Sequence, residues 1–348
     1  MTTRAARGRL EDRLASASPA AWRVLRSRRC RLTTMSDRMT WTQTRISLPD
    51  GGGFDRWRLG SAAPGLRVVI FGGTHGDETE GVIAANRIAG MELGLASGMV
   101  EVVPVVHEAA FAADTRTSPR DGADLARSFP GRADGTPTQA LAHALHTEVL
   151  GGCDLLIDLH TAGRNLVIPF LAGYIDDGRD ARGLGALAAR AFGADFVWRH
   201  AERPPGRTLS ALDAAIYTES PCAGPVDPSM VERYVAGCLR ALAALGMLAR
   251  PLVPAAAAPS LRITSGGNVD SDMQRAGAGG LFIARVGGGD KVAQGQVLGV
   301  VTDLRGRVLE EVRAQADGWV VVLPRRTHVK PGDGVVAVAA EDRRQDAK

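Results

Sequence analysis

A histidine and a glutamate three residues apart, His75 and Glu78, stand in the segment VVIFGGTHGDETEG. Four apolar residues at 68–71 predict a buried strand, and the glycines around His75 allow a sharp turn before a helix-like pattern begins. Zinc binds imidazole nitrogen and carboxylate oxygen, and a catalytic zinc held by two histidines and one glutamate keeps a further coordination position open. The pair therefore predicts two ligands of a metal site, with a third ligand to come from elsewhere in the chain.

His160 is the natural third ligand, because it ends a second apolar run in the segment DLLIDLHTAG. Asp158 lies two residues earlier on the same face of the predicted strand. Its carboxylate can accept a proton from a ligating imidazole and fix the tautomer of the ring. The alternative interpretation of His160 is a hydrogen-bonded histidine at the end of a strand, without a metal.

The strand-like segment AAIYTES, residues 214–220, ends in Glu219 just before a Pro- and Gly-containing turn. A glutamate at a strand end facing an activated water can take its proton and pass it to a leaving amine. We interpret Glu219 as the general base. The alternative is a surface glutamate held in an ion pair.

The segment from Arg116 to Gly131 is rich in Pro, Gly, Asp and Arg and fits neither the helical nor the strand period. Long structured loops of this kind often carry function. Amide hydrolysis needs a cation near the carbonyl oxygen that gains negative charge, and a second cation can hold a substrate carboxylate. We expect loop arginines to serve in these ways, and we interpret Arg120 and Arg132 as surface salt-bridging residues.

Three segments in this order, GGTHGDETEG, RTSPRDGADLARSFPG and IDLHTAG, resemble the succinylglutamate desuccinylase and aspartoacylase family of zinc carboxypeptidase-like hydrolases. The resemblance covers about residues 68–248 and, through a β-rich tail, most of the remaining chain. It implies an α/β fold with a zinc-carboxypeptidase-like mixed sheet flanked by helices and a smaller C-terminal all-β barrel-sandwich module. It also implies one zinc ion per chain, held by His75, Glu78 and His160.

The resemblance also gives roles to two arginines of the 116–131 loop. Arg116 would polarise the scissile carbonyl, and Arg127 would hold a substrate carboxylate. The family's glutamate on an equivalent late strand corresponds to Glu219. Where the family has Asp-Leu-Asn-Arg-x-Phe, this chain has DLARSF from Asp124, so Ala126 replaces an asparagine. The lost amide donor argues against an aspartate- or glutamate-type substrate.

The elements that position these residues follow from local patterns. Turn residues between two strand-like runs predict a hairpin over residues 43–59. Further patterns predict helices over 79–93 and 138–150, a strand over 99–107 that ends in His107, and a helix capped by Asp227. We interpret His107 as pocket lining at most.

Composition divides the chain into four parts: an extension, a catalytic domain, a linker and a β-rich module. Residues 1–40 form a basic extension that we expect to be disordered, residues 41–250 the zinc hydrolase domain, and residues 251–260 a Pro- and Ala-rich linker. Residues 261–341 carry a two-fold Gly- and Val-rich pattern, similar to biotinyl and lipoyl modules. Residues 301–316, which join the two halves, contain no lysine, so we expect a structural module without a carrier lysine.

The net charge of +4 is concentrated in residues 1–40, which carry +7 and leave −3 for the rest of the chain. A mildly acidic body argues against a nucleic-acid partner. The extension has no apolar run long enough for a signal peptide or membrane helix, and the four cysteines form no Cys-x-x-Cys pair. We expect a cytoplasmic protein without a membrane partner. The oligomeric state, including a homo-oligomer, stays open, as does a transit-like leader or a later start at Met35 or Met39.

The sequence therefore predicts a zinc-dependent hydrolase that cleaves the amide of a small N-acylated amino acid or amine, with a zinc-activated water as the nucleophile. One alternative is a metallocarboxypeptidase that acts on short peptides. A second is a non-catalytic protein that binds zinc or a ligand on the same fold, an idea that Ala126 favours and the complete set of ligands with Glu219 opposes.

Overall fold

The computed structural model describes residues 40–221, 224–256, 260–265 and 272–343. The predicted basic extension lies outside the described residues except for Thr40, and so do Cys30 and Cys222. Within the described part of the chain, no helix combines the length and the apolar character needed to cross a bilayer.

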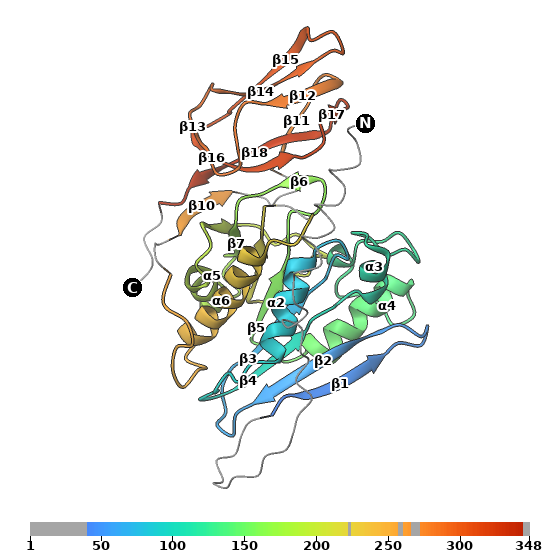
Figure 1. The fold of residues 1–348 in the computed structure, drawn as a ribbon, viewed down its shortest axis with the longest axis vertical. Helices are drawn as coiled ribbons and strands as arrows, with labels where there is room; N and C mark the ends of the chain where they lie inside the picture. The colour runs from blue at the N-terminus through green and yellow to red at the C-terminus, as the bar shows by residue number, and fades with distance from the viewer. Residues whose placement is uncertain (1–39, 222–223, 257–259, 266–271, 344–348) are drawn as a thin grey trace, which may run out of the picture. The chain divides into compact units, whose positions relative to one another are not determined.

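A large mixed sheet forms the centre of the described part of the chain and contains 14 strands there. Its first hairpin is antiparallel, strands β4, β3, β5 and β9 are parallel to one another, and β7 returns antiparallel to β9. The strands in spatial order are β1 (Thr42–Ser47), β2 (Gly53–Gly60), β4 (Met99–Val103), β3 (Arg67–Gly72), β5 (Leu155–Leu159), β9 (Ala215–Glu219), β7 (Leu171–Ile175), β8 (Phe196–His200) and β10 (Leu261–Ser265), followed by strands of the C-terminal part (Figure 1).

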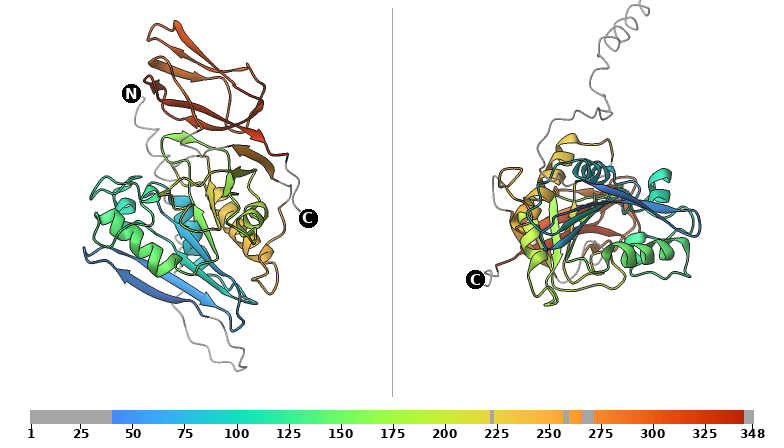
Figure 2. Two further views of the ribbon diagram at one scale, coloured as in Figure 1. Left: turned by 180° about the vertical axis from the view of Figure 1, so that it is seen from behind. Right: turned by 90° about the horizontal axis from the view of Figure 1, so that it is seen from below.

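Helices cover both faces of the central strands (Figure 1, Figure 2). One face packs under α2 (Thr79–Ala89), α5 (Leu184–Phe192) and α6 (Pro228–Ala244), and the other packs against α4 (Pro137–Ala144) and the π-helical turn Leu145–Leu150. The short helix α3 (Glu108–Ala113) follows β4. Strands covered on both faces are mostly apolar, as in the fully buried β5, whose one polar residue is Asp158. The mixed α/β fold is confirmed.

Predictions of single elements from local sequence patterns were correct for the first hairpin and for the cap of α6. The predicted hairpin is β1–β2, and Asp227 caps α6 by accepting a hydrogen bond from the backbone N–H of Ser229. The predicted strand over 99–107 was too long. Strand β4 ends at Val103 because Pro104 has no N–H to continue the ladder, and His107 precedes α3 instead. The helix predicted over 138–150 changes to a π-helical turn at Leu145.

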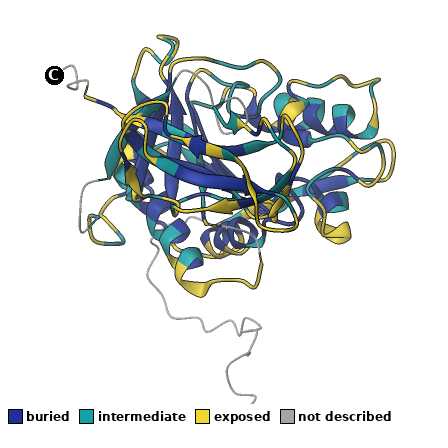
Figure 3. Cartoon of the chain, turned by 90° about the horizontal axis from the view of Figure 1, so that it is seen from above, coloured by how far each residue is buried: buried dark blue, intermediate teal, exposed yellow. Residues whose placement is uncertain are grey.

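The described residues 260–265 and 272–343 contain strands and no helix. Four of these strands, β12 (Gly280–Ala284), β14 (Val297–Thr302), β15 (Val308–Arg313) and β17 (His328–Val329), form a separate antiparallel sheet. An apolar cluster that includes Leu298, Val320 and Val335 forms the core of the C-terminal part. Buried segments run along the strands and exposed residues gather in the loops (Figure 3).

The C-terminal part is joined to the catalytic part by shared strands. Strand β10 pairs parallel with β8, β18 (Gly334–Glu341) pairs with β10, and β16 (Gly318–Pro324) pairs with β6 (Leu166–Val167). A buried ion pair between Arg199 of β8 and Asp342 strengthens the same junction, with 2.8 Å between Nε and Oδ2. This junction brings C-terminal residues next to the loop that follows β5.

We expect the C-terminal part to carry no covalent cofactor. The hairpin between β14 and β15 contains Asp303, Leu304, Arg305, Gly306 and Arg307, and none of these offers an amine. Lys291 lies elsewhere, with its amine 5.7 Å from the centre of the Trp319 ring. The intact mass after expression in a biotinylating and lipoylating host should equal that of the polypeptide. A mass increment of either group would contradict this expectation.

Candidate metal centre and active site

The turn between β3 and α2 places His75 and Glu78 side by side. Gly73 has a φ of +64°, a left-handed conformation that favours glycine. Gly76 passes so close to α3 that a Cβ atom there would lie 2.0 Å from the carbonyl carbon of Ala110. The turn is therefore sterically fixed, and it ends at Glu78, which precedes the first turn of α2.

The register of the parallel strands brings His160 and Glu219 to the same edge of the sheet. Leu159 of β5 is paired with Gly72 of β3 and with Thr218 of β9. The next residues, His160 and Glu219, therefore emerge together where the strands end, which is the usual location of chemistry in α/β sheets. The N–H of His160 donates to the carbonyl of Thr218, and the hydroxyl of buried Tyr234 donates to the carbonyl of His160.

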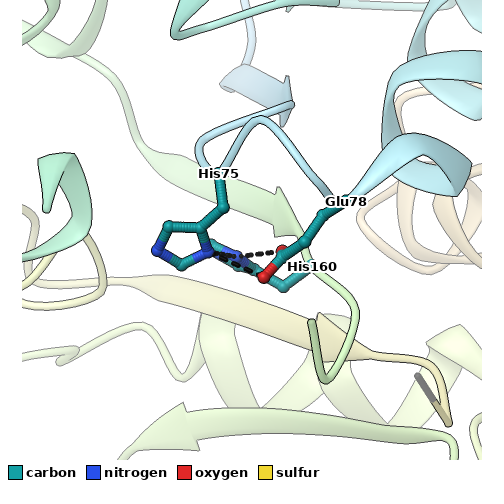
Figure 4. A group of neighbouring side chains, drawn as sticks. All are labelled: His75, Glu78 and His160. Atoms are coloured by element: carbon teal, nitrogen blue, oxygen red, sulfur yellow. Dashed lines mark hydrogen bonds and ion pairs between the residues drawn. The ribbon is translucent and has the colours of Figure 1, made fainter. Parts of the chain in front are cut away.

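The three predicted ligands converge in the structure (Figure 4). His75 Nδ1 lies 2.8 Å from Glu78 Oε1, and His160 Nδ1 lies 2.9 Å from Glu78 Oε2. The two Nδ1 atoms are 3.2 Å apart. All three side chains are buried, and their ligand atoms lie within 4.8 Å of one another.

A carboxylate holds the far nitrogen of each imidazole. Asp158 Oδ2 lies 2.9 Å from His160 Nε2, as predicted, and Thr74 donates its hydroxyl to the other oxygen of Asp158. Asp124 Oδ1 lies 3.1 Å from His75 Nε2. Because each Nε2 proton is held in this way, each Nδ1 presents its lone pair to the other ring and to Glu78.

The charges of the centre are strongly coupled. Burial favours the neutral form of Glu78, yet the charges and hydrogen bonds of His75 and His160 hold its pKa below the usual range. Burial likewise disfavours a charged His160, but Asp158 and Glu78 raise its pKa well above the usual value. For Asp124, the hydrogen bond from His75 and the charge of Arg116 outweigh burial and keep its pKa low. Each imidazole therefore has a carboxylate at both nitrogens, and Glu78 is shared between the two Nδ1 atoms.

This donor set fits a metal cation. Two neutral imidazoles and one carboxylate are ligands of a catalytic zinc site, and both imidazoles already have the carboxylate partners that orient such ligands. Two Nδ1 lone pairs 3.2 Å apart cannot satisfy each other without a proton or a cation between them. The residues present can therefore hold a metal, and protons will compete for the same atoms.

A cavity of about 560 Å³ opens next to the ligands. Five of the six predicted site residues line it, namely His75, Arg116, Arg127, His160 and Glu219. The sixth, Glu78, is buried and contacts His75 and His160. Its other walls include Tyr217 and His200, whose side chains are joined by a 2.9 Å hydrogen bond. The C-terminal part also contributes to the lining, through Met273, Arg275, Pro324, Arg326 and Gly334.

Arg116 lies directly beside the ligand atoms. Its Nη1 is 3.3 Å from His75 Nδ1 and 3.6 Å from Glu78 Oε1, and its Nε donates to Asp124 Oδ2. A guanidinium so placed can bind an oxygen that gains negative charge next to the ligands. Arg127 lines the same cavity farther along the loop, where its charge helps to keep the pKa of Asp124 low. Ala126, the neighbour of Arg127 in sequence, is buried and also lines the cavity.

Glu219 faces the same cavity from the end of β9. Its Oε2 atom has no hydrogen-bond partner among the described residues. Burial and the nearby Glu78 carboxylate raise its pKa well above the usual value. Two other carboxylates are engaged elsewhere: Asp158 with His160, and Glu108 with Arg45. Glu219 therefore has the free oxygen that a proton-transferring group needs.

Two features were not anticipated. The role of Asp124 depends on its contact with His75, which no spacing reveals, although Asp124 stood in the recognised loop motif. The Tyr217–His200 pair arises from the pairing of separate strands. His107, interpreted above as pocket lining at most, is buried and lines a second cavity of about 250 Å³, and burial lowers its pKa to about 4.

The chain is similar to known proteins over most of its length. Residues 64–245 match the model of the succinylglutamate desuccinylase/aspartoacylase catalytic domain. An N-alpha-acetyl-L-2,4-diaminobutyric acid deacetylase from Halomonas elongata is 29% identical over 293 residues, which cover 79% of this chain and 82% of that protein.

Two solved structures are similar over most of their length. The product-bound ectoine utilization protein EutE (DoeB) from Ruegeria pomeroyi has a TM-score of 0.74 at 25% identity, covering 88% of this chain and 100% of that chain. A succinylglutamate desuccinylase/aspartoacylase from Rhodobacter sphaeroides has a TM-score of 0.75 at 27% identity, covering 91% and 99%.

Replacing His160 by alanine should abolish tight metal binding, because the two remaining ligands cannot complete the site. Elemental analysis after loading with zinc should find about one ion per wild-type chain and a large loss in the variant. His143→Ala, the same change on α4, is the matched control and should retain the metal. Unchanged zinc in a folded His160→Ala protein would rule out this ligand set.

Proposed function

We propose that this chain, which belongs to the succinylglutamate desuccinylase/aspartoacylase family, is a zinc-dependent hydrolase of the amide bond in a small N-acylated amino acid or amine. The observation that carries the proposal is the convergence of His75, Glu78 and His160 with Arg116 and Glu219 at one cavity. The relative from Halomonas elongata, named as a deacetylase of an acetylated amino acid, supports the same reaction class.

The residues divide the hydrolysis between them. When bound, zinc would lower the pKa of a water molecule and polarise the acyl carbonyl. Glu219 takes a proton from the attacking water and delivers it to the nitrogen of the scissile amide. The carbon–oxygen bond forms, the carbon–nitrogen bond breaks, and a carboxylate and an amine leave. Arg116 donates to the carbonyl oxygen as its negative charge grows.

Recognition of the substrate falls to the loop around Arg127. A guanidinium can bind a carboxylate through two parallel hydrogen bonds, so we assign Arg127 to a substrate carboxylate. Ala126 offers no amide donor beside it, which favours N-acyl compounds with neutral or basic side chains. The side chain of the acetylated diaminobutyric acid named for the relative is of the basic kind.

The absence of paired cysteine motifs fits a cytoplasmic enzyme.

Peptide substrates are less compatible with the cavity. Met273 and Pro324 of the C-terminal part form a wall of the cavity, which favours a small molecule over an extended chain. A non-catalytic role is disfavoured by the free Oε2 of Glu219, because a protein that only binds a ligand does not need a proton acceptor at this position.

Glu219→Gln should keep zinc bound and lower turnover by roughly 10²-fold or more, since positioned general acid–base catalysis contributes about that much. Release of amine from Nα-acetyl-2,4-diaminobutyrate and from other N-acyl amino acids measures it. Glu232→Gln, at an exposed ion pair with Arg87, serves as the matched control. Parental turnover in Glu219→Gln would assign the proton transfer to another group.

Ala126→Asn should shift the preference of the enzyme toward acidic substrates. A hydrogen-bond donor lost from recognition is commonly worth about 1–3 kcal/mol, or roughly 5- to 150-fold in discrimination. We expect the wild type to act weakly on N-acetyl aspartate and N-succinyl glutamate, and the variant to gain on both, compared by kcat/KM. A strong wild-type preference for either compound would contradict this role of Ala126.

A further inference from the structure

We propose that Asp77 binds a cationic group on the amine portion of the substrate and thereby selects N-acyl compounds with a basic side chain. This inference rests on the proposed amide hydrolysis and adds to it a residue that determines specificity. Asp77 lies between His75 and Glu78 in the ligand turn, and its side chain lines the same cavity.

The Asp77 carboxylate is buried and incompletely satisfied. Asp77 is only 9% exposed, and its Oδ1 atom has no hydrogen-bond partner among the described residues. A buried carboxylate oxygen without a donor is costly. Because Asp77 lines the cavity, an ammonium group there would supply a compensating charge to its carboxylate. Oδ1 itself is shielded from solvent, so rotation of the Asp77 side chain would be needed for the ammonium group to donate to that atom.

Asp77 also lies close enough to the ligands to contact the same small molecule. A Cβ atom at Gly163 would be 3.7 Å from Glu78 Oε1 and 3.8 Å from Asp77 Oδ2. Because both oxygens are that close to one point, Glu78 Oε1 and Asp77 Oδ2 are neighbours across Gly163. A substrate whose acyl carbonyl meets the ligands can then place a short side chain against Asp77.

Most other carboxylates that line the cavity already have a partner or a proposed role. Asp124 and Asp158 contact the two histidines, and Glu219, which lines the cavity, is assigned to proton transfer. Glu202 also lines the cavity, but it is exposed and remains solvated. Asp77 thus combines burial, an unpaired oxygen and proximity to the ligands.

Neither Arg164 nor Arg116 takes the place of the proposed ammonium group beside Asp77. Arg164 interacts electrostatically with Asp77, but its guanidinium hydrogen-bonds to Asp114. Arg116 also acts on Asp77 through its charge and donates a hydrogen bond to Asp124. Neither supplies a hydrogen bond to Asp77 Oδ1. Together with Arg127, Asp77 gives the cavity opposite charges for a substrate that carries both a carboxylate and an ammonium group.

The test compares two substrates of nearly the same shape, Nα-acetyl-2,4-diaminobutyrate and Nα-acetyl-norvaline, with zinc-loaded enzyme. Hydrogen bonds to charged groups are worth about 1.5–3 kcal/mol, so the wild type should prefer the ammonium compound by roughly 10- to 150-fold in kcat/KM. Asp77→Asn should remove most of that preference and leave norvaline hydrolysis within about 3-fold. Asp77→Ser should behave in the same way if the Asn variant folds poorly.

Glu202→Gln is the matched control and should retain the preference, and zinc content and thermal unfolding are measured for every variant. Equal wild-type rates on the two compounds would overturn the inference while leaving the hydrolase proposal intact. An equal loss on both compounds in Asp77→Asn, or a loss of zinc, would also overturn it by showing a structural role. No hydrolysis of any N-acyl amino acid by the wild type would instead refute the proposed function, and this inference with it.

Discussion

The rest of the site depends on the contacts of two carboxylates with the two predicted ligand histidines. Asp158 and Asp124 contact the Nε2 atoms of His160 and His75. The two Nδ1 atoms therefore face each other at 3.2 Å, and each lies within 2.9 Å of an oxygen of Glu78. Such a cluster is unfavourable by itself, since it concentrates acceptors in a buried place. A cation removes that penalty, and therefore the same contacts that disfavour an empty centre create affinity for a metal.

The fold keeps this centre in place by drawing its parts from distant segments that are each locally rigid. The glycine turn fixes His75 and Glu78, while the register of β3, β5 and β9 brings His160 beside Glu219. The loop that supplies Asp124 is anchored by Asp121, which accepts two hydrogen bonds from Thr138 at the start of α4. Rigid support of this kind matters because metal geometry and proton transfer both tolerate little displacement.

Sequence alone was sufficient where chemistry and local pattern coincide. His75 and His160 follow apolar strands, and Glu78 lies three residues after His75 at the start of a helix-like pattern, so the convergence of these three residues could be predicted. Asp158 followed from the two-residue period of a strand. The contact of Asp124 with His75 joins residues 49 positions apart, and the pairing of β10 with β8 joins segments 65 apart in register. Such contacts depend on tertiary packing, which no local periodicity encodes. Strand β4 was overestimated because apolar residues continue past Pro104, where pairing stops.

Family membership indicates the class of reaction but not the substrate, because different residues of the cavity serve the two purposes. In the proposed reaction the scissile amide would meet the metal ligands, Arg116 and Glu219, and these residues would treat any acyl amide alike. Discrimination must come from the groups around them: the guanidinium of Arg127, the missing amide at Ala126 and the buried oxygen of Asp77. A neutral side chain would leave Asp77 unpaired, and an acidic one would meet repulsion there, whereas a basic one would satisfy it. Because an unpaired buried charge costs more than a mismatched apolar contact, one carboxylate can outweigh the shape of the remaining cavity in selecting the substrate.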